Sequence, residues 1–182
     1  MYWYKSVILG FRFAGLALII SQVSCKPEIK QTNAAYFDLN NYFAQQAENY
    51  SKADFNVVKT VSRNGETETK TVKIANWQGE LSVFSESDIN KPSWRNSYKT
   101  TVSGNYTIYK AIDPDLKTRE IILKKKAHNQ VAYLMVFNVI NNSLFQTREK
   151  LTFYPDSLYI IQRKQHVRFL GTNNYLIEGK LK

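Results

Sequence analysis

Few residues in this 182-residue chain have the chemistry of a catalytic or metal site. The chain contains one cysteine, Cys25, and two histidines, His128 and His166, and neither histidine has a second ligand at a metal-binding spacing. Asp113 and Asp115 flank a proline and can form an acid–base pair, but Asp-Pro is also a common turn sequence. Phosphate-binding loops and nucleophile motifs do not occur. We therefore expect a non-enzymatic protein without a cofactor, and keep an enzyme that uses Asp113 or Asp115 as the alternative.

The single cysteine follows a segment with the order of a secretory signal. Lys5 and Arg12 supply positive charge, residues 13–20 (FAGLALII) are apolar, and the small residue Ser24 precedes Cys25. This order is typical of an exported protein. It also resembles a bacterial lipobox, in which the cysteine is acylated and becomes the mature N-terminus. Because one cysteine cannot form an internal disulfide, acylation also explains its presence in an exported chain.

Two other interpretations of this segment stay open. A lipobox usually has Leu where this chain has Gln22, so Cys25 can be incidental to a plain secretory signal. A retained transmembrane anchor is the other alternative. However, the uncharged residues 13–24 make a helix of about 18 Å, short of a hydrocarbon core of about 30 Å. We expect a signal peptide over 1–24, a lipidated N-terminus and tether over 25–33, and one domain over 34–182.

The formal net charge of +10 suits an anionic partner. Export argues against nucleic acid, which leaves an anionic lipid or glycan, or a protein partner in the envelope. Basic residues fall on successive predicted strands: Lys124, Lys125, Lys126, Arg148, Lys150, Arg163, Lys164, Arg168 and Lys180. From these we predict a cationic binding face made of Lys124, Lys126, Arg148, Lys150, Arg163 and Arg168. The alternative is a plain exposed sheet face on which Lys and Arg prevent edge aggregation.

The elements that must position these residues begin with a helix over 34–51. Apolar residues recur there with helical spacing and predict one buried face: Tyr36, Leu39, Phe43, Ala47 and Tyr50. Residues 55–62 and 68–74 are rich in β-branched residues, and Asn64-Gly65 between them predicts a hairpin. A second helix is predicted over 75–87, where apolar residues again recur with helical spacing.

After residue 97 the pattern changes to strands separated by short turns. We predict strands over 98–103, 105–111, 118–126, 130–140, 143–154, 157–169 and 174–180. Short connections favour antiparallel neighbours, so these strands form a meander. The sequence thus predicts an α+β fold, a long antiparallel β-meander that can curve into a half-barrel. It is packed by the N-terminal amphipathic helix and by a second helix after the hairpin.

As a whole, the chain resembles small envelope lipoproteins of the Bacteroidota. The likeness covers the signal, Cys25, the amphipathic first helix and the C-terminal run YPDSLYIIQRKQHVRFLGTNNYLIEGK. It implies an outer-membrane lipoprotein held by its acyl chains, with no catalytic residues to transfer. A looser likeness of fold is to periplasmic lipoprotein carriers and their outer-membrane receptor.

Two hypotheses of function follow. The first is a binding or scaffolding module at the membrane. The second is a carrier that holds a lipid or other hydrophobic ligand between the curved sheet and the helices. A continuous apolar cavity of roughly several hundred Å³ would support the carrier, and a filled core would argue against it.

Overall fold

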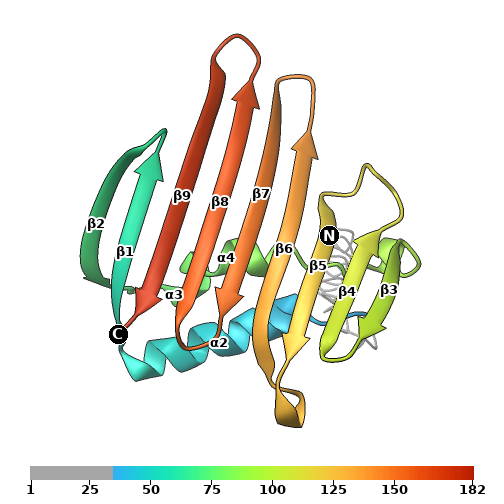
Figure 1. The fold of residues 1–182 in the computed structure, drawn as a ribbon, viewed down its shortest axis with the longest axis horizontal. Helices are drawn as coiled ribbons and strands as arrows, with labels where there is room; N and C mark the ends of the chain where they lie inside the picture. The colour runs from blue at the N-terminus through green and yellow to red at the C-terminus, as the bar shows by residue number, and fades with distance from the viewer. Residues whose placement is uncertain (1–34) are drawn as a thin grey trace, which may run out of the picture. The chain divides into compact units, whose positions relative to one another are not determined.

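The computed structural model describes residues 35–182, which form a nine-stranded antiparallel sheet with helices on one face (Figure 1). The spatial order of the strands is β2-β1-β9-β8-β7-β6-β5-β4-β3. The bounds are β1 Asn56–Arg63, β2 Glu66–Lys73, β3 Tyr98–Ser103, β4 Tyr106–Ala111, β5 Thr118–Lys125, β6 Val131–Asn141, β7 Phe145–Tyr154, β8 Leu158–Val167 and β9 Gly171–Leu181. The predicted α+β fold with a long antiparallel meander is confirmed.

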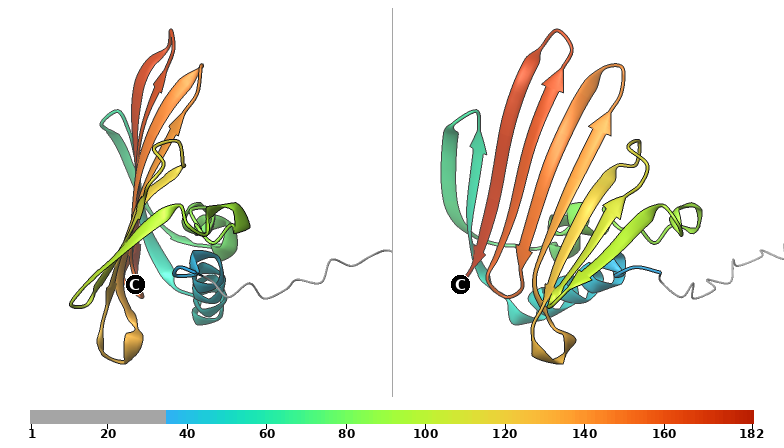
Figure 2. Two further views of the ribbon diagram at one scale, coloured as in Figure 1. Left: turned by 90° about the vertical axis from the view of Figure 1, so that its right-hand side faces the viewer. Right: turned by 45° about the vertical axis from the view of Figure 1, so that its right-hand side comes forward.

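The sheet is twisted but not closed into a barrel (Figure 2). Strands β3 to β9 follow one another as the meander, and the hairpin β1–β2 joins it through pairing of β1 with β9. Strands β2 and β3 are therefore the two edges. Strands β1 and β9 lie more than a hundred residues apart in the chain. Their pairing is therefore a long-range contact that forms only when the whole domain folds.

The first described helix, α2 (Leu39–Ala53), begins at Asp38, whose carboxylate accepts a hydrogen bond from the Asn41 N–H at 2.8 Å. The predicted start at residue 34 is too early because Tyr36 reaches the core from ahead of the helix, where its N–H donates to the Asn90 side chain at 3.0 Å. The predicted second helix is two short ones, α3 (Trp77–Glu80) and α4 (Ser82–Ser85). Single 3₁₀ turns follow at Pro92–Trp94 and Ala127–Asn129.

The helices cover one face of the sheet (Figure 2). Aromatic rings fill the layer between the helices and the sheet. Phe43 of α2 stacks on Phe84 of α4 with ring centroids 4.8 Å apart, and lies 4.9 Å from Phe153 of β7. The buried apolar cluster of the described part lies within residues 36–181, and residues 34–182 form a compact unit by themselves. We therefore expect this unit to fold without the preceding residues.

A partly buried polar contact joins α3 to the sheet. Glu80 of α3 accepts a hydrogen bond from the Tyr159 hydroxyl at 2.5 Å and pairs with Lys59 of β1 at 2.7 Å. Burial, followed by the hydrogen bond to Glu80, raises the pKa of Tyr159 far above its usual value. The Tyr159 ring also crosses Gly179 of β9, where a Cβ atom would lie 2.0 Å from the ring Cζ. The contact therefore requires glycine at position 179.

The predicted signal peptide, the predicted acylation site Cys25 and the predicted tether lie outside the described residues. They remain predictions from the sequence. Within residues 35–182, no helix is both long and apolar enough to cross a membrane.

Candidate anion-binding site on the uncovered sheet face

The sheet has a second face, which none of the helices α2, α3 and α4 covers (Figure 2). Side chains alternate between the two faces along each strand. Phe153 is buried against α2, so Lys150 and Arg148, three and five residues away on β7, point to the opposite face. The register of β8 places Gln162 beside Lys150 and Lys164 beside Arg148. We call this side of the sheet the uncovered face.

A shallow groove of about 400 Å³ lies across β6 to β9 and β1. Its lining residues belong mostly to the uncovered face: Ser62, Gly65, Phe137, Arg148, Glu149, Lys150, Gln162, Arg163, Lys164, Asn174, Tyr175 and Leu176. Phe137 and Leu176 are half-buried, whereas Arg148, Lys150 and Lys164 are exposed. A molecule in the groove would therefore meet apolar side chains, two amides and the three cations of the uncovered face, whereas the fourth lining cation, Arg163, is paired with Glu149.

Two of these cations, Arg148 and Lys164, are direct partners across β7 and β8. Cβ atoms of such partners are about 5 Å apart, and like charges at that separation repel. Their neighbours on the outer strands are Val139 and Asn174, and neither cation forms an ion pair within the described residues. An anion placed between them would replace this repulsion with charge-assisted hydrogen bonds.

A second pair of cations on the same face has a different environment. Lys99 of β3 and Lys110 of β4 are also direct partners. Glu120 of β5, however, lies directly beside Lys110 and supplies a neighbouring negative charge. The Lys99–Lys110 pair lies near the sheet edge and outside the groove, so it is a matched control for the groove pair.

Acidic side chains lie near the groove, but within the described residues none forms an ion pair with Arg148, Lys150 or Lys164. Glu149 is among the lining residues, yet its carboxylate lies on the helix face, where it accepts a hydrogen bond from Arg163 Nε at 2.7 Å. Glu120 and Glu178 belong to the uncovered face, and each is separated from Lys150 by one intervening strand. Two strand spacings amount to about 10 Å, so the positive charge of the groove is not cancelled at contact distance.

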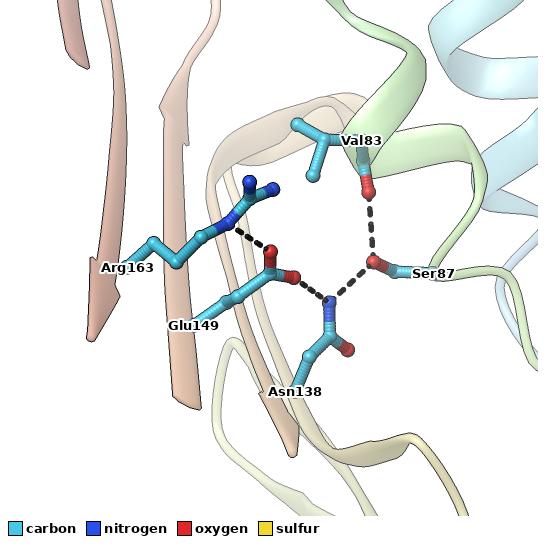
Figure 3. Close-up of polar contacts among 5 residues, drawn as sticks. All are labelled: Val83, Ser87, Asn138, Glu149 and Arg163. Carbon is cyan, nitrogen blue, oxygen red and sulfur yellow. Dashed lines mark hydrogen bonds and ion pairs between the residues drawn. The ribbon is translucent and has the colours of Figure 1, made fainter. Parts of the chain in front are cut away.

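A polar cluster behind the groove joins the sheet to α4 (Figure 3). Glu149 accepts a second hydrogen bond from the Asn138 amide at 3.2 Å, and this amide also donates to Ser87 Oγ at 2.9 Å. Ser87 in turn donates to the Val83 carbonyl at 2.8 Å. Glu149 and Asn138 are only 6% and 1% exposed, so the cluster is a fixed part of the interior. The cluster neutralises Arg163, whereas Arg148 and Lys164, at the next register position, form no ion pair within the described residues.

Another part of the uncovered face carries a tyrosine cluster made of Tyr106, Tyr133 and Tyr154. The Tyr133 ring lies 6.2 Å from Tyr106 and 5.7 Å from Tyr154, and the Lys124 ammonium lies 5.2 Å from the Tyr106 ring centroid. The hydrogen bond to Lys124, followed by one to Tyr133, lowers the pKa of Tyr106. Tyr133 is four residues from Phe137 along β6, about 13 Å, so this cluster is separate from the groove.

The structure separates the residues of the predicted cationic face. Arg148 and Lys150 lie together in the groove, with Lys164 beside them. Arg163 also lines the groove, but it is paired with Glu149 on the helix face. The other predicted site residues lie elsewhere: Lys124 beside the tyrosine cluster, Lys126 and Arg168 in the turns after β5 and β8, and Cys25 outside the described residues.

Sequence reasoning did not select Lys164 for the site, nor the amides Gln162 and Asn174. The signal that places Lys164 is the alternation on β8, where Tyr159 and Ile161 are buried. Residues with the opposite parity, Gln162 and Lys164, must then face away from the core. The same parity assigns Arg163 to the helix face.

The residues with catalytic or metal-binding chemistry have ordinary structural contacts. Asp113 accepts a hydrogen bond from the Asp115 N–H at 2.8 Å, which closes the turn between β4 and β5. His166 Nδ1 lies 3.0 Å from Thr172 Oγ1, and His128 lies in a turn with φ of 59°. Among residues 35–182, no group of three His, Cys, Asp or Glu side chains is placed to hold a metal ion.

Comparison with known proteins gives no match. No family model, no curated protein and no solved structure is significantly similar to this chain. The chemistry of the groove is therefore the basis for assigning a function.

Proposed function

We propose that this protein is a non-enzymatic lipoprotein of the bacterial cell envelope that binds an anionic ligand in the groove of its uncovered face. The ligand presents phosphate or carboxylate groups, as an anionic lipid head group or an acidic glycan does. The observation that supports this best is the Arg148–Lys164 pair, two like charges held side by side whose direct neighbours on the adjoining strands are the uncharged Val139 and Asn174. Export, acylation of Cys25 and attachment at the outer membrane are further parts of the proposal and depend on the sequence pattern.

The groove residues suit this ligand chemistry. The guanidinium of Arg148 can hold two oxygens of one phosphate or carboxylate, and Lys150 and Lys164 add point charges. The half-buried Phe137 and Leu176 offer apolar contact to the carbon skeleton that carries the anionic group. Because the groove is shallow, it fits one segment of a larger molecule rather than enclosing a small one.

The helix side of the sheet supports the carrier hypothesis less well. Aromatic side chains fill the layer between α2 and the sheet. The apolar pocket at the margin of this layer, lined by Val61, Val83 and Ile161 among others, has a volume of about 160 Å³. Pockets for drug-sized ligands usually have about 300–1,000 Å³. These observations favour a binding module over a carrier of hydrophobic ligands.

The proposal is tested by titrating residues 34–182 with two soluble anionic probes, dihexanoyl phosphatidylglycerol below its micelle concentration and polygalacturonate. The first probe represents a lipid head group and the second an acidic glycan. We expect at least one of them to bind, with an affinity that falls as salt is added. The Arg148→Glu/Lys164→Glu variant should bind at least about tenfold more weakly, because each charge-assisted hydrogen bond contributes about 1.5–3 kcal/mol.

The matched control is Lys99→Glu/Lys110→Glu, which makes the same change in net charge on the same face but outside the groove. It should weaken binding by no more than about threefold, through the change in long-range potential alone. Failure of both probes to bind the wild type, or equal weakening in the two double variants, would disprove an anion site in the groove.

The anchor is tested separately in the full chain expressed in a bacterial host. The Cys25→Ala variant should lose the label from a supplied fatty acid and leave the membrane fraction. Wild-type protein that stays in the membrane fraction without taking up label would contradict acylation at Cys25.

A further inference from the structure

Two neighbouring hairpin tips project beyond the part of the sheet that the helices cover (Figures 1 and 2). The first joins β6 to β7 over residues 142–144, and the second joins β8 to β9 over residues 168–170. They are held together because the Arg168 N–H donates to the Leu144 carbonyl at 2.9 Å. Asn142 shapes the first tip, since its side chain accepts hydrogen bonds from the Leu144 and Phe145 N–H groups at 2.9 Å.

Three large apolar side chains at these tips face solvent. Leu144 is 68% exposed, Phe169 is 93% exposed and Leu170 is 81% exposed. Phe169 and Leu170 are the most exposed large hydrophobic residues in the part of the chain that the structure describes. Isolated exposed apolar residues are normal on a protein surface, but a group of three on adjoining tips marks an interaction site.

The conformation of Phe169 is unusual for a turn. Its φ is 71°, in the left-handed region that a bulky side chain rarely adopts. At the tips of the other hairpins the residues with positive φ include Asn64, Gly65 and Gly104, types that accept this conformation easily. A glycine or asparagine at position 169 would relieve the backbone, so the strained turn carries its aromatic ring at a cost to folding.

The strand ends around the tips carry only positive charge. Residues 139–148 and 164–177 contain no Asp or Glu. They do contain Arg148, Lys164 and Arg168, and the guanidinium of Arg168 lies 5.3 Å from the Phe169 ring centroid. Apolar side chains at a protruding end, with cations behind them, complement a surface that is apolar inside and negatively charged outside.

The spacing of these two zones fits a lipid bilayer. Lys164 lies three residues before the end of β8 at Val167, about 10 Å along the strand. The polar zone on each side of a hydrocarbon core is about 5–8 Å thick. With the apolar tips in the outer part of the core, Arg168 and then Lys164 and Arg148 would lie at the level of the lipid phosphates.

We propose that the two tips insert Leu144, Phe169 and Leu170 into an anionic lipid bilayer while the basic residues behind them contact the head groups. This surface shares Arg148 and Lys164 with the proposed anion site, but its apolar residues do not line the groove. It also gives the folded domain a membrane contact of its own, separate from an acyl chain on Cys25.

The test uses residues 34–182, which lack the signal and Cys25, and sedimentation with vesicles of phosphatidylcholine containing about a third phosphatidylglycerol. We expect binding to these vesicles and much weaker binding to pure phosphatidylcholine. Phe169→Ser should weaken partition of the protein into the vesicles by about tenfold or more, because moving one large apolar side chain out of water favours the bound state by at least that factor. Phe169→Ser/Leu170→Ser should abolish it.

The matched control is Val102→Ser, a similar loss of an exposed apolar side chain, 68% exposed, at the end of edge strand β3. It should bind vesicles as the wild type does. A second readout is the Phe169→Trp variant, whose emission should shift to the blue and be quenched by bromine-labelled lipid tails. Wild-type protein that does not bind the anionic vesicles, tip variants that bind as well as wild type, or an emission of the Phe169→Trp variant that vesicles leave unshifted would each overturn insertion.

The outcomes separate this proposal from the anion site. Tip variants should keep the affinity of the wild type for the soluble probes, since the groove residues are unchanged. Tip variants that lose binding to soluble anions as well as to vesicles would show that the tips do not form a separate lipid surface.

Discussion

The Gly179→Ala substitution adds one methyl group at the point where the Tyr159 ring crosses β9. The new Cβ atom would lie 2.0 Å from the ring Cζ and 2.3 Å from the hydroxyl oxygen, distances that no pair of such atoms can keep. The ring cannot move freely, because it is fully buried and its hydroxyl donates to Glu80 at 2.5 Å. Either the ring must shift or the two strands must separate.

Both responses are costly. Displacing the hydroxyl removes a hydrogen bond to a charged group, which contributes about 1.5–3 kcal/mol. Overpacking of a filled core costs about 1–3 kcal/mol more. We therefore expect Gly179→Ala to lower the free energy of unfolding by about 3–5 kcal/mol. Backbone entropy alone predicts the opposite sign, because alanine in place of a strand glycine with an ordinary φ stabilises by about 0.4–1 kcal/mol.

Urea unfolding of residues 34–182, followed by tryptophan fluorescence, measures this difference. Lys180→Ala, at the next position on β9 and exposed, is the control and should stay within about 0.5 kcal/mol of wild type. In a Tyr159→Ala background, Gly179→Ala should cost less than about 1 kcal/mol, because the ring that it clashes with is gone. An equal loss in both backgrounds, or no loss in the wild-type background, would refute the steric explanation.

Two further predictions concern the aromatic core. Phe43→Ala should lower the free energy of unfolding by about 3–5 kcal/mol, because Phe43 is 2% exposed and contacts three other rings. Asn40→Ala, at an exposed position of the same helix, is the control in the same urea assay. Burial raises the pKa of Tyr50 and Tyr98 to about 12, whereas unfolded tyrosine ionises near about 10. The free energy of unfolding should therefore stay constant below pH of about 10 and fall as the pH rises from about 10 to about 12. Tyr98→Phe should make this fall less steep. Equal urea midpoints at pH of about 10 and about 12 would contradict the prediction.

Local patterns in the sequence predicted the elements well where neighbours in the chain decide them. The strands over 98–103 and 118–126 were found nearly to the residue, because β-branched runs and turn residues mark both ends of each strand. The start of α2 was missed because Tyr36 continues the helical spacing although it lies ahead of the helix. The second helix was predicted as one piece, but it is interrupted at Leu81, whose φ and ψ of −94° and 3° are not helical.

The site depended on relations that a linear pattern does not contain. The outer neighbour of β9 is β1, which lies more than a hundred residues earlier in the chain. No short turn connects the two strands, so a local pattern cannot predict that they pair. Arg163 was grouped with Arg148 because both are basic residues of neighbouring strands. Their register places them on opposite faces, and the partner that neutralises Arg163, Glu149, lies fourteen residues earlier on β7. Charge alone therefore grouped residues that the register places on different faces of the sheet.

The lengths of the strands connect the groove with the tips. Strands β6 to β9 have ten or eleven residues, whereas β3 and β4 have six. The additional residues extend beyond the helices (Figure 2). Apolar side chains there would bury little surface and so would contribute little to stability. Instead they carry the Arg148–Lys164 pair and, at their ends, exposed Phe169 and Leu170. Repulsion between Arg148 and Lys164 and the strained turn at Phe169 both lower the stability of the fold. Folding alone does not explain why the chain has them. Both costs are offset if the protruding half of the sheet binds anionic groups and a membrane surface.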